Sequence, residues 1–314
     1  MGSVVLSVDA ELGWGFHDQA SPPRDRIAAS RRGWLTLLEL LDEYEVPATW
    51  AVVGHLFLSD CDGVHAEHPT PIGWFDHERG PRQLPGDFRY GRGLVEAIRA
   101  ASVPHEVGSH TFSHVEMGEE GTSRALARAE VAASIEVARD AGLELSSFVF
   151  PRNSVGHRDV LAAYGFQCYR GVQPDDPGPG LLRPARKLAT ATVGDPPQLI
   201  RPTIDEYGLV DVPASMFLFG FEGLPRSVVE QVIGDPVVRQ ARRGVDEVVE
   251  TDRVFHMWLH PNNLVRERDV ERMRSVLEHV VRARRETSLE IETMQEVADR
   301  VLHERSTSEP ELVG

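Results

Sequence analysis

Two histidines separated by three residues are the first feature of this sequence that could do chemistry. They stand in the segment His110-Thr111-Phe112-Ser113-His114. Spacing of i and i+4 would place both imidazoles on one face of a helical turn, and neutral imidazole is the commonest metal ligand in proteins. Because the chain holds 13 histidines, such a pair can also arise by chance. His110 and His114 are therefore candidate metal ligands, with satisfied core or surface histidines as the alternative.

Two carboxylates follow the first apolar segment of the chain. Asp9 and Glu11 come directly after residues 4–8, which read as a buried strand. Residues two apart in an extended chain point to the same side, so both carboxylates should face the carboxyl end of that strand. Active sites of α/β folds assemble at such ends. The alternative is an aspartate that caps a loop beside a solvated glutamate.

Residues 254–261 show a strand pattern in which alternate positions differ in chemistry. His256, Trp258 and His260 share one face, and the side chains between them on the other face are apolar. A core strand would not bury two histidines on one face without polar partners. We expect this face to line a cleft, the alternative being an edge strand with a wet face.

The fourth candidate is a pair of polar residues, Arg152 and Asn153, that follows the apolar residues 148–150. Pro151 stands between the apolar segment and this pair. Arg152 could orient a carboxylate from the first strand or raise its acidity. The alternative is an exposed arginine in a loop.

These residues must be positioned by elements that alternate along the whole chain. Apolar segments predict strands at 4–8, 48–54, 106–108, 146–150, 208–213 and 254–259, and helical spacing predicts helices at 24–41, 93–101, 123–141, 158–165, 226–243, 265–285 and 294–301. Segments 59–90 and 173–201, rich in proline and glycine, are expected to be loops, and the tail from residue 304 is expected to fray. Such alternation favours a parallel sheet in one barrel-like α/β domain.

Composition limits the classes of function. The chain has 314 residues, 41% of them hydrophobic, which suits a globular protein with a full core rather than a disordered or fibrous one. A formal charge of −16 argues against nucleic acid or anionic lipid as a partner, since both bind basic patches. No apolar run approaches a membrane span of about 18 residues, and the N-terminus lacks the basic region of a signal peptide. We therefore expect a cytoplasmic protein, with a homo-oligomer left open.

The order of these motifs resembles the polysaccharide deacetylases, carbohydrate esterase family 4, also called the NodB-homology domain. Residues 106–114 match the family's histidine motif, E-x-G-x-H-[TS]-x-x-H, and residues 48–54 look like its second strand. The resemblance covers about residues 3 to 300. It implies a single distorted (β/α) barrel, with residues 1–303 as the catalytic domain and 304–314 as a flexible tail.

The resemblance also implies roles for individual residues. Asp9 would be the catalytic base and His260 the general acid. Glu11, His110 and His114 would bind one divalent metal ion, zinc first, with cobalt, manganese or nickel as alternatives. The first motif departs from the family's usual T-F-D-D-G, because one residue is inserted and glutamate replaces the second aspartate. Arg152 is assigned to catalysis, although the family has its arginine before the proline.

Further residues are assigned to substrate binding. Trp258 or Trp14 could provide the apolar platform that sugar rings favour, and Arg170 could contact an anionic group of the substrate. Asn153 and His256 are expected to line the same cleft. His65, His68, Asp76 and His77 could form a second metal site, but we interpret them as part of a loop at the rim of the cleft.

These assignments predict a divalent-metal-dependent hydrolase of amide bonds. Its substrate would be a carbohydrate or sugar conjugate, and its reaction the removal of an N-acetyl group. A nucleotide-linked or lipid-linked sugar precursor fits a cytoplasmic enzyme better than a polymer outside the membrane. Two alternatives remain, namely a hydrolase of a small cyclic amide, as in allantoinase, on the same fold, and a non-catalytic glycan-binding relative.

Overall fold

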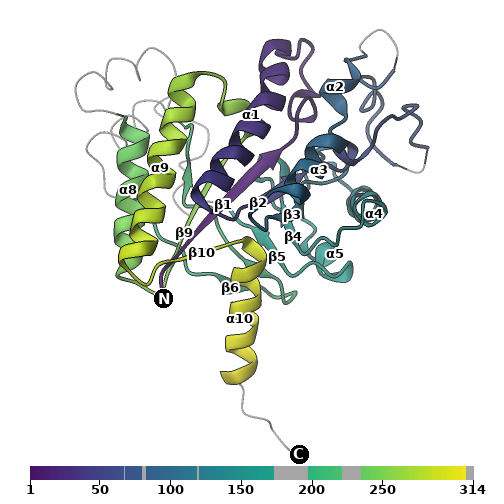
Figure 1. Ribbon diagram of the computed structural model, residues 1–314. Helices are drawn as coiled ribbons and strands as arrows, with labels where there is room; N and C mark the ends of the chain where they lie inside the picture. Colours follow the sequence, from purple (N-terminus) through teal and green to yellow (C-terminus); the bar gives the residue numbers. More distant parts are fainter. Residues whose placement is uncertain (67, 80–82, 119, 173–196, 221–234, 309–314) are drawn as a thin grey trace, which may run out of the picture.

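The computed structural model describes residues 1–66, 68–79, 83–118, 120–172, 197–220 and 235–308. One curled sheet occupies the centre of the molecule (Figure 1). Its strands are β1 (Ser3–Ala10), β2 (Thr49–Val52), β3 (Glu106–Ser109), β4 (Ser147–Val149), β5 (Cys168–Arg170), β6 (Thr203–Ile204), β7 (Val210–Asp211), β8 (Met216–Phe217), β9 (Val254–Leu259) and β10 (Glu290–Glu292). Among the described residues, no helix has the length and apolar character needed to cross a membrane.

The strands run β6-β7-β5-β4-β3-β2-β1-β9-β8 across the sheet, and β10 pairs separately with β1. Every neighbouring pair is parallel except β6 with β7. Parallel neighbours require crossover connections, which described helices supply between the consecutive strands from β1 to β5. This arrangement agrees with the distorted (β/α) barrel expected from the sequence.

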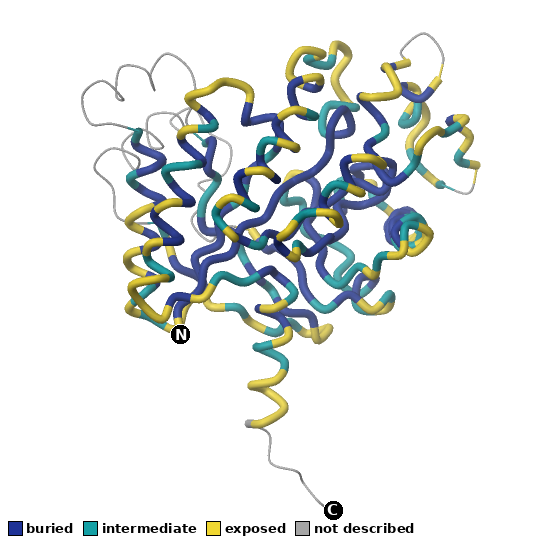
Figure 2. The backbone as a smooth tube through the Cα atoms, viewed as in Figure 1, coloured by how far each residue is buried: buried dark blue, intermediate teal, exposed yellow. Residues whose placement is uncertain are grey.

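Helices surround the sheet. They are α1 (Arg24–Tyr44), α2 (Gly86–Arg89), α3 (Arg92–Ala100), α4 (Arg124–Asp140), α5 (Arg158–Ala163), α8 (Pro236–Val249), α9 (Glu267–Glu286) and α10 (Met294–Ser308), with short 3-10 helices η1 (Trp14–Phe16), η2 (Gly54–Phe57), η3 (Pro151–Asn153) and η4 (Pro261–Asn263). Figure 2 shows the central strands buried, whereas the helices have exposed outer faces.

The sequence explains the two main kinds of element. All eight residues of β1 are buried, because β1 is hydrogen-bonded to β2 and β9 and covered on both faces. In α1, apolar side chains at helical spacing, including Trp34, Leu37 and Leu41, form one fully buried stripe. The hydroxyl of Ser123 accepts a hydrogen bond from the Leu126 amide at 3.1 Å and so caps α4.

Several boundaries differ from the sequence predictions. The terminal helix, predicted for 294–301, extends from Met294 to Ser308, and within it Arg300 pairs with Glu292 at 2.7 Å. The helix expected at 226–243 runs from Pro236 to Val249, where Asp235 caps its first turn. Residues 226–234 of that prediction, and 173–196 of the predicted loop 173–201, lie outside the described residues.

The carboxyl ends of the central strands meet at one end of the sheet. Strands β1, β3, β4 and β9 end at Ala10, Ser109, Val149 and Leu259. The candidate residues Glu11, His110, Asn153 and His260 follow those ends. Parallel strands place these loops side by side, so residues far apart in sequence surround one pocket.

Candidate active site

A pocket of about 350 Å³ lies at the carboxyl end of the sheet. It is lined by Asp9, Glu11, Gly15, Phe16, Arg26, His110, His114, Arg152, Asn153, Phe217, Trp258, His260 and Asn262. The predicted base, general acid and three metal ligands thus share one cavity, although they come from three separate segments. Parallel strand order, rather than proximity in sequence, brings them together.

The histidine motif does not form the helical turn expected from its spacing. It is an irregular loop after β3, in which Thr111 and His114 have positive φ angles of 61° and 64°. Backbone hydrogen bonds from Gly54 N–H to the Thr111 carbonyl, 2.8 Å, and from His55 N–H to the Phe112 carbonyl, 3.0 Å, hold the loop. The ring centroids of His110 and His114 still lie 5.1 Å apart, so both imidazoles face one point.

Glu11 lies between the two imidazoles. Its Oε2 is 2.8 Å from His114 Nε2 and 3.6 Å from His110 Nε2, and one ligand atom from each residue lies within 4.8 Å of the others. His110 Nδ1 donates to the Val149 carbonyl at 2.8 Å, since a carbonyl can only accept. In the neutral ring this leaves the Nε2 lone pair directed at Glu11.

This donor set fits a divalent cation. Two imidazoles with one carboxylate form the ligand set of many catalytic zinc sites, which keep a position open for water or substrate. The residues are buried, yet the pocket opens beside them. Burial opposes ionisation of Glu11, but the charge of His260 and the hydrogen bonds that His110 and His114 donate when protonated lower its pKa well below the usual range. An ionised carboxylate beside neutral imidazoles is the state that binds metal.

Asp9 is held by Arg170 on β5, which β4, β3 and β2 separate from β1 in the order of the sheet. Arg170 Nη1 and Nη2 donate to Asp9 Oδ1 and Oδ2 at 2.6 and 2.8 Å, and both side chains are buried. Burial raises the pKa of Asp9, but the charge and hydrogen bonds of Arg170 outweigh it, so the net shift is downward. The Asp9 carboxylate is therefore oriented and ionised.

A buried polar chain supports this ion pair from below. Arg170 Nη1 also donates to the Ser7 hydroxyl at 3.1 Å, and that hydroxyl lies 2.8 Å from His256 Nε2. His256 Nδ1 donates to the Val212 carbonyl at 3.1 Å. Burial and the charge of Arg170 lower the pKa of His256 to about 3, so its ring is neutral and accepts from Ser7.

His260 stands at the mouth of the pocket. Its Nε2 lies 3.4 Å from Glu11 Oε1 and 4.0 Å from Asp9 Oδ2, and about a fifth of its side chain (21%) is exposed. The Asn263 side chain accepts the backbone N–H of His260 at 2.9 Å and fixes the turn after β9. His260 thus faces both carboxylates while remaining accessible to a bound molecule.

The expectation that Arg152 orients the first-strand carboxylate is wrong. Arg152 pairs with Asp18 at 2.7 Å and with Glu116 at 2.8 Å, and 43% of its side chain is exposed. It has a positive φ of 52° in the turn after Pro151, which directs it to the rim of the pocket. Arg170 on β5 holds Asp9 instead.

Three assigned substrate-binding residues lie elsewhere than predicted. The guanidinium of Arg170 is occupied by Asp9, Ser7 and Asn153, so it is a buried support rather than a contact for an anionic substrate group. His256 is fully buried in the chain beneath it. Trp14 is also buried, donates to the Arg89 carbonyl at 3.0 Å and stacks near His55, so it belongs to the core.

Trp258 and Asn153 do line the pocket. The ring centroids of Trp258 and Phe217 lie 4.3 Å apart. The guanidinium carbon of Arg170 lies 4.5 Å from the Trp258 ring centroid. Sequence reasoning missed Phe16, Arg26, Phe217 and Asn262, since none stands in a recognisable motif. The Pro261-Asn262 dipeptide after the late histidine was the one available signal.

Comparisons with known proteins bear on the family and the fold. Residues 25–167 match the family model described as polysaccharide deacetylase. That range contains His110 and His114. A comparison with curated proteins finds no significant match. The resemblance to the polysaccharide deacetylase family that the sequence shows is thus confirmed for residues 25–167.

Solved structures show the same fold. A protein from Mycobacterium smegmatis assigned as a polysaccharide deacetylase superposes with a TM-score of 0.62 at 16% identity, covering 96% of this chain and 91% of that one. Puue allantoinase gives 0.59 at 13% identity, with 95% and 89% covered. A protein from Pseudomonas aeruginosa PAO1, also assigned as a polysaccharide deacetylase, gives 0.57 at 14%, again with 95% and 89% covered. These structural similarities confirm the distorted (β/α) barrel. The match to the family model supports a deacetylase or amide hydrolase as the class of enzyme.

Proposed function

We propose that this chain is a divalent-metal-dependent amide hydrolase that removes the N-acetyl group from an N-acetylated sugar. The observation that carries the proposal is the convergence, in one pocket, of the Glu11–His110–His114 ligand set, the Arg170-held Asp9 and His260. Acyl transfer from an amide needs an activated water, stabilisation of the oxyanion and a proton for the amine. Asp9 suits the activation of water, a metal ion held by the ligand set suits the oxyanion, and His260 suits the protonation of the amine.

Glu11, His110 and His114 would hold the metal ion. When bound, the ion supplies Lewis acidity toward the amide carbonyl and toward water. Asp9 accepts the proton from the attacking water, because Arg170 keeps the carboxylate ionised and aims it into the pocket. The bidentate contact also prevents Asp9 from rotating away, which preserves attack geometry.

His260 donates a proton to the leaving amine. An amine leaves poorly unless it is protonated, so a positioned acid is required. The Nε2 of His260 points toward Glu11 and Asp9 from the exposed side of the site, where a departing sugar would stand. Trp258 and Phe217 supply an apolar wall against which a sugar ring can pack.

The experiment compares purified protein with and without a chelator. Acetate release from N-acetylhexosamine oligomers and from nucleotide-linked N-acetylhexosamines is followed, then followed again after divalent metals are restored. Loss with chelation and recovery with zinc, cobalt, manganese or nickel is expected. Equal activity in both samples would remove the metal from the proposal.

A second candidate is the hydrolysis of a small cyclic amide. The pocket is small, Arg26 Nε donates to Asn262 Oδ1 at 3.1 Å in its lining, and Asn153 contributes a second amide to that lining. Planar guanidinium and amide groups match the alternating donors and acceptors of a ureide. A panel that includes allantoin beside the acetylated sugars separates the two candidates. Metal binding without turnover of any member would indicate a glycan-binding relative.

A further inference from the structure

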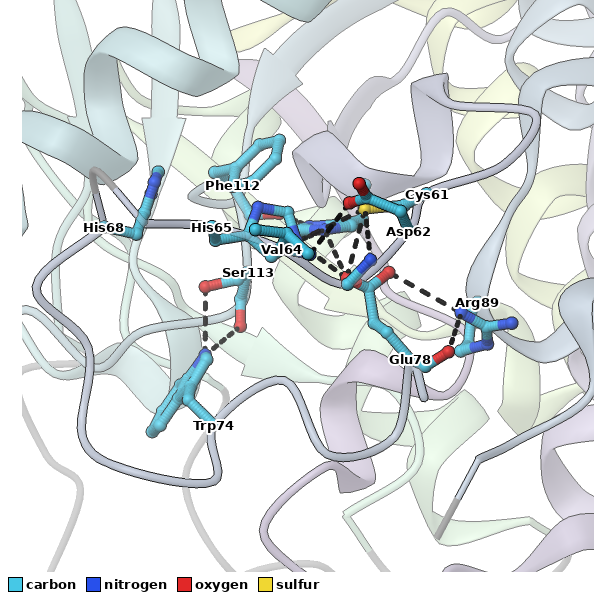
Figure 3. Close-up of polar contacts among 12 residues, drawn as sticks. Cys61, Asp62, Val64, His65, His68, Trp74, Glu78, Arg89, Phe112 and Ser113 are labelled. Carbon is cyan, nitrogen blue, oxygen red and sulfur yellow. Dashed lines mark hydrogen bonds and ion pairs between the residues drawn. The ribbon is translucent and has the colours of Figure 1, made fainter. Parts of the chain in front are cut away.

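A second group of metal-binding side chains lies outside the pocket. His55 lies in η2, and its ligand atom groups with those of Cys61, His65 and Glu78. Figure 3 shows Cys61, His65 and Glu78 side by side, although Glu78 comes from the later part of the segment. Of the second cluster suggested by the sequence, only His65 belongs here. His68 pairs with Glu130 at 3.1 Å instead.

The ligand atoms of this group converge. Cys61 Sγ lies 3.3 Å from both His65 Nε2 and Glu78 Oε2, and His65 Nε2 lies 2.7 Å from the same oxygen. His55 Nε2 is 3.4 Å from His65 Nε2 and 3.5 Å from Glu78 Oε2. A tetrahedral zinc ion with ordinary Zn–N and Zn–S bonds separates its ligands by about 3.3–3.6 Å. The observed spacing requires little movement to reach that geometry.

Neighbouring groups orient the donors toward one point. His55 Nδ1 donates to the Phe112 carbonyl at 3.0 Å, which in the neutral ring leaves the Nε2 lone pair facing the cluster. The Gly63 N–H points at Cys61 Sγ, 3.4 Å away, a contact that suits a thiolate. Glu78 presents Oε2 to the cluster while Tyr90 and Arg89 approach Oε1, at 3.3 and 3.6 Å.

Burial and charge also favour a cation. The side chains of His55 and Glu78 are fully buried, and that of His65 is 11% exposed. One thiolate and one carboxylate would neutralise a divalent ion, and two neutral imidazoles complete the set. A sulfur and two imidazole nitrogens select zinc over magnesium or calcium, which prefer oxygen.

We propose that His55, Cys61, His65 and Glu78 bind a structural zinc ion, separate from the metal of Glu11, His110 and His114. All four positions of a tetrahedron are filled by protein, the arrangement of structural rather than catalytic zinc. The two ligand sets share no residue, so this proposal stands independently of the proposed function.

The zinc would fasten the segment 55–78 to the loop that carries the catalytic histidines. His55 contacts Phe112 through both its backbone and its ring, with ring centroids 4.1 Å apart. Trp74, from the same segment, donates to the Ser113 hydroxyl at 3.0 Å (Figure 3). Phe112 and Ser113 lie between His110 and His114, so the ion would stabilise their positive-φ loop from outside.

The first test measures zinc by mass spectrometry in full-length protein after gel filtration. Wild type should carry two equivalents, Cys61→Ala one and the pair Cys61→Ala/His110→Ala none. His110→Ala alone should retain the structural ion. Cys168→Ala is the matched control, because the second cysteine is buried against Met294 and should keep both ions.

The second test needs no variant and covers the case in which Cys61→Ala fails to fold. Cobalt-substituted wild type should show a near-ultraviolet thiolate-to-cobalt charge-transfer band, and zinc X-ray absorption should show one sulfur at about 2.3 Å. His110→Ala should keep both signals. Absence of the cobalt band and of the sulfur shell in wild type would overturn the proposal and establish a metal-free hydrogen-bonded cluster. If His110→Ala removes all of the bound zinc while Cys61→Ala removes none, the structural site is refuted and only the proposed catalytic metal is supported.

Discussion

Arg170 binds both carboxylate oxygens of Asp9, with Nη1–Oδ1 at 2.6 Å and Nη2–Oδ2 at 2.8 Å, although 161 residues separate the two in the chain. The pair is buried, so either charge is left unpaired and poorly solvated if the other is removed. Its two parallel hydrogen bonds require the planar fork of arginine, which lysine does not have.

Arg170→Met should therefore destabilise the protein strongly. Removing one member of a buried pair typically costs about 3–5 kcal/mol, because the remaining charge is left unpaired. Urea unfolding measures the loss. Asp9→Asn added to Arg170→Met should recover part of it, since the orphaned carboxylate is then gone. Arg152→Met should cost far less, because its ion pairs are partly exposed to solvent. A double variant no more stable than Arg170→Met would contradict this account.

His260→Ala should lower turnover without losing metal. General acid catalysis typically contributes about 10²–10⁴-fold, and His260 lies outside the ligand group formed by Glu11, His110 and His114. Steady-state kinetics with metal analysis on the same sample provides the check. His303→Ala, at an exposed position on α10, is the control. Unchanged kcat in His260→Ala would exclude it from the mechanism.

Gly15→Ala should weaken metal binding. A Cβ atom at Gly15 would overlap the carboxyl group of Glu11, which must then move away from His110 and His114. We expect a loss in metal affinity of about 10–100-fold, the range seen when the support of a ligand is removed. Competition with a chromogenic chelator measures it. Gly93→Ala is the matched control, because open space surrounds that position in α3, and it should bind metal as wild type does. Equal affinities for all three proteins would refute the argument.

His105 should make the fold sensitive to mild acid. The Ala48 N–H donates to His105 Nδ1 at 3.2 Å, so the folded state holds the neutral ring, and burial lowers its pKa to about 4. The unfolded chain, with a histidine pKa of about 6.5, binds the proton more readily. This contribution to stability is therefore complete above about pH 6.5 and is lost as the pH falls toward 4.

The measurement is urea unfolding at about pH 7.5 and about pH 5 for wild type and His105→Gln. Wild type should lose more stability than the variant between these values, by on the order of 1 kcal/mol after allowance for partial exposure. Parallel losses in the two proteins would show that His105 does not contribute.

The sequence was most informative about individual elements and ligand types. Strong apolar patterning predicted β1, β9 and α1 nearly to their ends, because burial on one or both faces restricts residue type there. The carboxylates Asp9 and Glu11 were placed correctly at the end of β1. The short strand β5 was not predicted, because its residues Cys168–Arg170 combine a small apolar, an aromatic and a charged side chain and show no strand-like alternation.

Which histidines and arginines face the pocket was decided only by tertiary structure. Alternation along β9 places His256 and His260 on one face, yet His256 lies in the buried chain beneath Asp9 and His260 at the pocket mouth, because the pocket opens only beyond the strand end. Likewise the sequence predicted Arg152 as the partner of a first-strand carboxylate and Arg170 as a contact for an anionic group of the substrate. The strand order across the sheet selected Arg170, and the positive φ of Arg152 turned that side chain outward.

The sequence by itself determined the family resemblance and the alternation of strands and helices. It also predicted that Asp9, Glu11, His110, His114 and His260 work together around one cleft. These inferences depend on apolar patterns and motif spacings, which neighbouring residues in the chain are enough to define. Only tertiary structure decided the partner of Asp9, the non-helical form of the histidine loop and the gathering of His55, Cys61, His65 and Glu78. Those outcomes depend on contacts between segments far apart in the chain, and their geometry is fixed by parallel strand packing and by backbone bonds that no local pattern encodes.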